Sequence, residues 1–126
     1  MTINQDLYNR MYDISVATGI ETHLTLPMNE VPYPFIVMGE IQIVPRKTAT
    51  RLLGKAYVTM QVWGSRTQRK EVSATCEKLR VDSRLIKTKT RTLKQVVNAS
   101  DYQIREDNST ANTLWQGVLN IEFNIL

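Results

Sequence analysis

The sequence has few of the side chains on which catalytic and metal sites most often depend. Its 126 residues include one cysteine, Cys76, and one histidine, His23. A single cysteine cannot form a disulfide within the chain, and one cysteine with one histidine cannot make a His/Cys metal cluster. The same scarcity disfavours a Cys-His or Ser-His active site. The composition therefore favours a protein that is not an enzyme and that needs no cofactor and no metal.

Other catalytic motifs are missing too. The five glycines are scattered along the chain, so there is no glycine-rich loop that could hold a phosphate group. The sequence has no Gly-x-Ser-x-Gly elbow, no Cys-x-x-Cys pair and no two carboxylates at helical spacing. We interpret His23 as structural or exposed, and Cys76 as a small core residue on an apolar stripe. Catalysis by Asp or Glu side chains is the enzymatic alternative that stays open.

Long apolar runs are also absent. No segment approaches the roughly 20 apolar residues that span a bilayer, so no membrane association is expected. Residues 1–10 are polar and lack the order of a signal peptide, which favours assembly in the cytoplasm. Hydrophobic residues make up 42% of the chain and charged residues 22%, the balance of an ordinary globular protein. We expect residues 1–126 to form a single domain.

The basic residues are concentrated in one part of the chain. Residues 41–94 hold 14 of the 16 Lys and Arg but only three of the 12 Asp and Glu, so their net charge is +11. The rest of the chain has a net charge of −7. A basic segment can lie against nucleic-acid phosphates, or it can meet an acidic surface of another copy in a head-to-tail ring. A solvated surface without a partner is the third interpretation.

The first helix is expected near the start of the chain. Thr2 and Gln5 have the spacing of a capping box, and either Thr2 or Asn4 can cap the helix. Apolar residues recur at helical intervals between Leu7 and Ile14, and Gly19 is a plausible end because glycine accepts a left-handed conformation. The narrow apolar stripe predicts a surface helix that packs on another element.

The second helix is expected from about residue 66 to residue 80. Ser65 and Gln68 again have capping-box spacing. The apolar stripe consists of Val72, Cys76 and Leu79, and most of the other positions are charged. The pattern predicts a second surface helix that shows one stripe to a sheet.

Residues 35–44 predict a strand, because they are rich in β-branched and apolar side chains. Three prolines within residues 27–34 predict an extended loop before it. Gly39 is expected at a bulge or a close approach of two backbones. The side chains expected on one face of this strand are Phe35, Val37, Ile41 and Ile43.

Further strands follow from a two-residue period of apolar and polar side chains. Gly64 is expected to end the second of the long strands. Trp63 and Trp115 lie near strand ends and suit either core packing or an oligomer contact. The expected strands are residues 20–26 at a sheet edge, 55–63, 102–106 and 113–126. The order of elements predicts an α+β fold, with one mixed or mainly antiparallel sheet and two helices packed on one face.

The sharpest feature is a basic arm within residues 81–97. Its run from Lys87 to Thr92 alternates charged residues with threonine, which favours an exposed strand or a flexible arm over a helix. A solvated hairpin, a contact between subunits and a surface that faces DNA all stay open, but without aromatic residues the arm does not suit base stacking. Its candidate interface or channel-facing residues are Arg84, Lys87, Lys89, Arg91 and Lys94. A neighbouring basic loop adds the candidate contacts Arg46, Lys47 and Arg51.

The order of these segments resembles a known family. The opening Leu7-Tyr8-x-x-Met11-Tyr12 helix is followed by a proline-rich loop that runs into Pro32-Tyr33-Pro34-Phe35-Ile36-Val37. A basic loop, the strand Ala56-Tyr57-Val58-Thr59-Met60-Gln61-Val62-Trp63 and a charged helix come next. In this order the chain is similar to the small tail-completion proteins of long-tailed phages, the tail-terminator or tail-to-head joining proteins.

The resemblance implies a structural protein of the virion. It implies a hexameric ring that caps the finished tail tube, ends the addition of tube subunits and joins the tail to the head connector. The expected partners are other copies of the chain, the tail tube protein and the head-completion or connector protein, and DNA passes through the ring without specific binding. The alternative, which rests on the basic segment, is a small nucleic-acid-binding α+β module.

Overall fold

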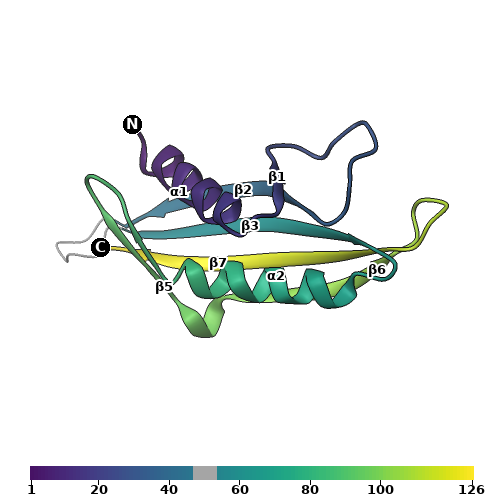
Figure 1. Ribbon diagram of the computed structural model, residues 1–126. Helices are drawn as coiled ribbons and strands as arrows, with labels where there is room; N and C mark the ends of the chain where they lie inside the picture. The colour runs from purple at the N-terminus through teal and green to yellow at the C-terminus, as the bar shows by residue number, and fades with distance from the viewer. Residues whose placement is uncertain (47–53) are drawn as a thin grey trace.

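A mixed β-sheet carries both helices on one of its faces (Figure 1). The computed structural model describes residues 1–46 and 54–126, within which the sheet has seven strands. The predicted α+β fold, with a mixed sheet and two helices on one face, is confirmed. The elements along the chain are α1 (Ile3–Ala17), β1 (Glu21–His23), β2 (Phe35–Pro45), β3 (Gly54–Ser65), α2 (Arg69–Asp82), β4 (Leu85–Lys87), β5 (Thr92–Gln95), the 3-10 turn η1 (Val97–Ala99), β6 (Asp101–Asp107) and β7 (Leu114–Ile125).

The strand order is β1-β2-β3-β7-β5-β4, and β6 also pairs with β7. The pair β1–β2 is parallel, whereas all other pairs in the described residues are antiparallel. One side of β7 pairs with β3, and its other side is shared by β6 and β5. The two long central strands, β3 and β7, have 12 residues each, which gives a sheet about 40 Å long.

The sheet has two distinct ends. At the first, which we name the loop end, β2 begins and β3 ends, so that Phe35 pairs with Trp63. This end carries the β1–β2 connection, residues 24–34, and the β6–β7 connection, residues 108–113. At the opposite end, which we name the hairpin end, lie the β4–β5 hairpin, the start of α1 and the C-terminus (Figure 1).

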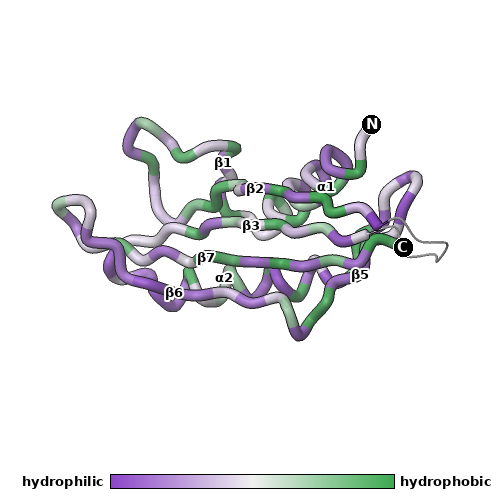
Figure 2. Tube along the Cα trace, turned by 180° about the vertical axis from the view of Figure 1, so that it is seen from behind, coloured by the Kyte–Doolittle hydropathy of each residue, from purple (hydrophilic) through white to green (hydrophobic). Residues whose placement is uncertain are grey.

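The core lies between the helices and the sheet. Leu7 and Met11 of α1 and the stripe of α2 are fully buried against the sheet. The stripe predicted for α2 is confirmed, because Val72, Cys76 and Leu79 have no exposed surface. The face away from the helices is seen in Figure 2, where hydrophilic and hydrophobic residues alternate along the strands.

Helix α1 begins as the sequence predicts. Thr2 is its N-cap, and Thr2 Oγ1 accepts a hydrogen bond from Gln5 N at 3.1 Å. Gly19 follows the helix with a φ of +82°, the left-handed conformation that ends many helices. The buried stripe of α1 differs from the predicted one at one position, because Ser15 is buried and Ile14 is only partly buried. Ser15 can be buried because its hydroxyl bonds that of Thr22 on β1 at 2.7 Å.

Helix α2 begins later than predicted. It starts at Arg69, because residues 65–68 form a turn in which Gln68 N donates to Ser65 O at 2.9 Å. Gln68 Oε1 accepts from Ser65 N at 3.0 Å, so the predicted pair does interact, but before the helix. The prediction that Gly64 ends the strand was wrong. Gly64 lies inside β3, where a Cβ would lie 2.5 Å from Val72 of α2, so the glycine permits close packing.

The bulge predicted at Gly39 is confirmed, and it corrects the predicted face of β2. The pairing with β3 shifts between Met38 and Ile41. A bulge reverses the side to which later residues point, so Phe35 and Val37 lie on the face away from the helices. Ile36 and Met38 share the core face with Ile41 and Ile43 instead. The four residues that were predicted to share a face therefore do not.

Short strands were the least well predicted elements. The edge strand β1 has three residues rather than the seven predicted, although it does lie at the sheet edge. Residues 27–34 form neither helix nor strand, as expected from their prolines. Residues 81–97 contain the end of α2, the β4–β5 hairpin and the start of η1. The strand interpretation of the basic arm is thus confirmed for residues 85–87 and 92–95.

Candidate interface on the basic hairpin

The five cations predicted as a candidate interface come together on the β4–β5 hairpin and its base. Lys87 ends β4, Lys94 lies in β5, and Lys89 and Arg91 belong to the turn between them. Arg84 directly precedes β4. Leu85 pairs with Lys94 and Lys87 with Thr92, which makes the hairpin a short antiparallel ladder. All five cations are exposed.

The hairpin turn is held by hydrogen bonds of its own backbone and of Thr88. Thr88 N donates to Arg91 O at 2.9 Å, and Thr88 Oγ1 accepts from Arg91 N at 3.0 Å. Threonine hydroxyls stabilise such turns by replacing a backbone partner. The cationic side chains of Lys89 and Arg91 are therefore carried by an ordered turn.

The base of the hairpin is fixed to the rest of the protein. Ile86 and Leu93 are fully buried in the core. Leu93 also pairs with Ile125 of β7. The alternation of the ladder places these apolar side chains on the core face and leaves Leu85 and Lys94 on the other. The basic arm is thus an edge of the sheet rather than a separate appendage.

The hairpin cations form no ion pair with an acidic side chain in the described part of the chain. The ion pairs there join Arg10 to Asp13, Lys55 to Glu122, Lys78 to Asp82 and Arg80 to Glu77, with His23 close to Glu21. Grouped like charges repel one another, and an anion that binds among them removes this repulsion. The hairpin is therefore suited to an anionic partner.

The second predicted cluster is described only in part. Arg46 is exposed and directly follows β2, at the hairpin end of the sheet. Lys47 and Arg51 lie outside the described residues. Arg46 adds a further cation to the end that carries the hairpin.

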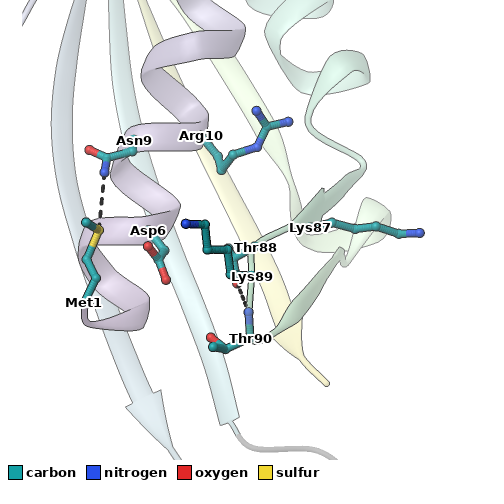
Figure 3. Close-up of a pocket in the computed structure, with 8 residues that line it drawn as sticks. All are labelled: Met1, Asp6, Asn9, Arg10, Lys87, Thr88, Lys89 and Thr90. Carbon is teal, nitrogen blue, oxygen red and sulfur yellow. Dashed lines mark hydrogen bonds between the residues drawn. The ribbon is translucent and has the colours of Figure 1, made fainter.

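A cavity of about 530 Å³ lies between the hairpin and the first half of α1 (Figure 3). Lys89 extends toward α1, whereas Lys87 points away from it. The cavity is lined by Met1, Asp6, Asn9, Arg10, Lys87, Thr88, Lys89 and Thr90. The residues of α1 that line this cavity were not among the candidate residues predicted from the sequence. No local pattern could have found them, because they lie about 80 positions before the hairpin and are brought there by the sheet.

Exposed acidic residues lie at the other edge of the sheet. Glu21 belongs to β1 and Glu40 to β2, and both are exposed. In the strand order β1 and β4 are the two outermost strands. The two edges of the sheet therefore differ in charge, as the uneven distribution of charge in the sequence had suggested.

The remaining candidate residues have structural contacts. His23 is half-buried and its ring packs edge-on against Phe35, with 5.4 Å between the ring centres. His23 Nε2 lies 3.3 Å from Glu21 Oε1, without the geometry of a hydrogen bond. Cys76 is fully buried, and this burial raises the pKa of its thiol to about 12. A protonated, buried thiol fits the core role that was predicted for it.

The two tryptophans lie on opposite faces of the sheet. Trp63 is half-buried on the face away from the helices, and its Nε1 donates to Gln61 Oε1 at 3.1 Å. Trp115 packs partly against the core, and its Nε1 donates to Arg66 O at 2.9 Å. The guanidinium of Arg69 lies 5.3 Å from the centre of the Trp115 ring, a cation–π contact. Trp115 thus helps to fix the turn before α2.

No protein-family model matches the chain, and no curated protein is significantly similar to it in sequence. In the residues that the structure describes, no helix is both long and apolar enough to cross a membrane. Nor do three or more His, Cys, Asp or Glu side chains of residues 1–46 and 54–126 gather where they could hold a metal ion.

Proposed function

We propose that the protein is a structural subunit that assembles into a ring of the tail-terminator type found in long-tailed phages. The ring caps the tail tube, ends its polymerisation and joins the tail to the head connector. It belongs to the virion, at the junction of head and tail, and it is assembled in the host cytoplasm. The subunit acts by its shape and its contacts, without catalysis.

One observation carries the proposal: among residues 1–46 and 54–126 the basic hairpin at one edge of the sheet forms no ion pair, and the other edge exposes Glu21 and Glu40. Two unlike edges on one subunit favour head-to-tail association, because each edge attracts the other edge of the next copy. Head-to-tail contacts close into a ring when the rotation between copies fits. The hexameric number and the tail partners rest on the family resemblance described above.

Assembly is the direct test of this function. The purified protein is expected to form rings visible by electron microscopy, either alone or after mixing with tail tubes, and mass measurement in solution gives the number of copies. A protein that stays monomeric and never joins tubes contradicts the proposal.

A charge-reversed hairpin tests the role of its cations. Lys87→Glu, Lys89→Glu and Arg91→Glu together should leave the fold intact, because exposed charges contribute little stability. Ring formation should be lost at about 0.15 M salt, where exposed charges still interact at short range. The control reverses two other exposed cations that form no ion pair in the described residues, Arg66 and Lys70, and should assemble normally. Normal assembly of the hairpin variant eliminates the hairpin as a contact between subunits.

A nucleic-acid-binding module is the second candidate, favoured by the five exposed cations of the hairpin. Duplex DNA binding measured at two salt concentrations separates the two functions. Phosphate contacts predict affinity that falls steeply with salt, by a slope that grows with the number of phosphates neutralised. Weak binding together with ring formation favours the structural subunit.

A further inference from the structure

The loop of residues 24–34 exposes an unusual number of apolar side chains. Leu24 is 57% exposed, Leu26 is 56% exposed and Met28 is fully exposed. The acidic residue Glu30, two positions after Met28, is also exposed. Figure 2 shows hydrophobic stretches along this loop, which projects from the loop end of the sheet. A projecting run of exposed apolar side chains is typical of a segment that binds another protein surface.

The loop is positioned by contacts at its second half. The ring of Tyr33 packs against that of Phe35, with 5.3 Å between the ring centres. Tyr33 O accepts a hydrogen bond from Gln68 Nε2 at 3.3 Å. Prolines at three of its positions further restrict the backbone. The prolines and the contacts of Tyr33 therefore reduce the conformational entropy that the loop loses on binding.

The cavity at the other end of the sheet has complementary chemistry. The cation that extends into it from the hairpin is Lys89, Arg10 lines it from α1, and its one acid is Asp6. The aliphatic stems of the lysines and of Met1 supply apolar surface beneath the charged groups. Such a surface accepts a segment that combines an apolar side chain with a carboxylate.

The loop and the cavity of one copy cannot meet. They lie at opposite ends of a sheet about 40 Å long. The loop connects the edge strand β1 to β2, whereas the cavity is bounded by the hairpin of the other edge. A contact between the two surfaces therefore joins two copies head to tail.

We propose that the loop of residues 24–34 of one copy docks in the cavity between α1 and the β4–β5 hairpin of the next copy. Met28 enters the cavity, and Glu30 faces Lys89. The contact rests on the proposed function, since it specifies one contact through which the copies associate head to tail. It also gives the hairpin cations the acidic partner that they lack within the described part of their own chain.

Disulfide trapping tests the contact directly. Met28→Cys and Thr90→Cys are made as separate variants, mixed, and oxidised with copper phenanthroline. The native Cys76 is buried and does not compete. The expected result is a disulfide-linked dimer that forms in the mixture. The matched control pairs Met28→Cys with Val97→Cys, an exposed position on η1 away from the cavity, and should give little or no such dimer.

A charge exchange tests the pairing of Glu30 with Lys89. Glu30→Lys and Lys89→Glu should each raise the protein concentration needed for half-assembly, and the double variant should recover assembly. Met28→Asp should raise that concentration about tenfold or more, because a buried apolar side chain is lost from the contact. Met28 is fully exposed in the subunit, so the variant should fold as the original does.

The results separate this contact from the proposed function. Rings that form normally from Met28→Asp and Glu30→Lys, with no trapped dimer, overturn the contact and leave the ring. A protein that forms no ring and joins no tube overturns both. Protection of Lys89 from amine labelling by duplex DNA, with no protection on self-association, overturns the contact in favour of a nucleic-acid surface.

Discussion

Gln95 and Arg80 are joined by a hydrogen bond that fixes the base of the hairpin to α2. Gln95 Nε2 donates to Arg80 O at 2.9 Å and to Ser83 Oγ at 3.1 Å. Ser83 Oγ in turn donates to Leu79 O at 2.7 Å. The last carbonyls of a helix lack partners within the helix, and the Gln95 amide supplies one to the carbonyl of Arg80. The direction of the hairpin therefore depends on buried polar contacts as well as on apolar packing.

Replacing Gln95 with Met should destabilise the protein by about 1–2 kcal/mol, because two hydrogen bonds are lost while the side-chain volume is kept. Urea denaturation followed by circular dichroism measures the change. The control is Gln103→Met on the exposed part of β6, which should change the free energy of unfolding by less than about 0.5 kcal/mol. Equal effects of the two substitutions on the free energy of unfolding would contradict a stabilising role of the Gln95 hydrogen bonds.

Gly117 permits α2 to lie close to β7. A Cβ at this position would lie 2.5 Å from Cys76 Sγ and 3.0 Å from Val72. Gly117→Ala should therefore cost about 1–3 kcal/mol of stability through overpacking. In the background of Cys76→Ala, which removes the sulfur, the same substitution should cost clearly less. A double-mutant cycle measures this coupling, and strictly additive effects would show that the two residues do not share the space.

The Cys76 thiol should make stability depend on pH in the alkaline range. Burial raises its pKa from 9.0 to about 12 in the folded protein, so its contribution to stability is complete below about pH 9 and is lost as pH rises toward 12. Between those values the contribution falls by about 1.4 kcal/mol per pH unit. The free energy of unfolding is measured at several pH values for the original protein and for Cys76→Ala. Tyrosine and lysine residues titrate in both proteins, so the difference between the two curves gives the contribution of the thiol. Parallel curves for the two proteins contradict the raised pKa.

The bulge in β2 depends on the absence of a side chain at Gly39. A Cβ there would overlap with the backbone carbonyl of Thr59, and Glu40 N donates to Thr59 Oγ1 at 2.9 Å. Gly39→Ala should thus destabilise the fold by about 1–3 kcal/mol. Thr59→Ser keeps the hydroxyl and should be nearly neutral. Thermal unfolding of both variants checks the prediction, and an unchanged midpoint for Gly39→Ala would be inconsistent with the close approach.

The elements that the sequence predicted well are those with many periodic residues. Thr2 as the cap of α1, the stripe of Val72, Cys76 and Leu79, and the long alternation of β3 and β7 are all found in the structure. Each depends on local geometry or on a repeated pattern over several turns or pleats. The short strands β1, β4 and β5 have three or four residues each, too few for a pattern to emerge.

The face of β2 illustrates a different limit. Glycine at position 39 did indicate a bulge, but a two-residue period carried through it assigns Phe35 and Val37 to the wrong face. Which residues a bulge displaces depends on the partner strand. Only the pairing with β3 therefore decides the orientation on both sides of Gly39.

The sequence by itself determined the α+β class, the two amphipathic helices and the concentration of positive charge in one segment, because composition and periodicity are properties of neighbours along the chain. Only the tertiary structure decided where that charge lies. It places five of the cations on an edge hairpin beside the first half of α1, and it places the apolar loop of residues 24–34 at the far end of the sheet. Such placements arise from strand pairing between distant residues, which no local pattern encodes.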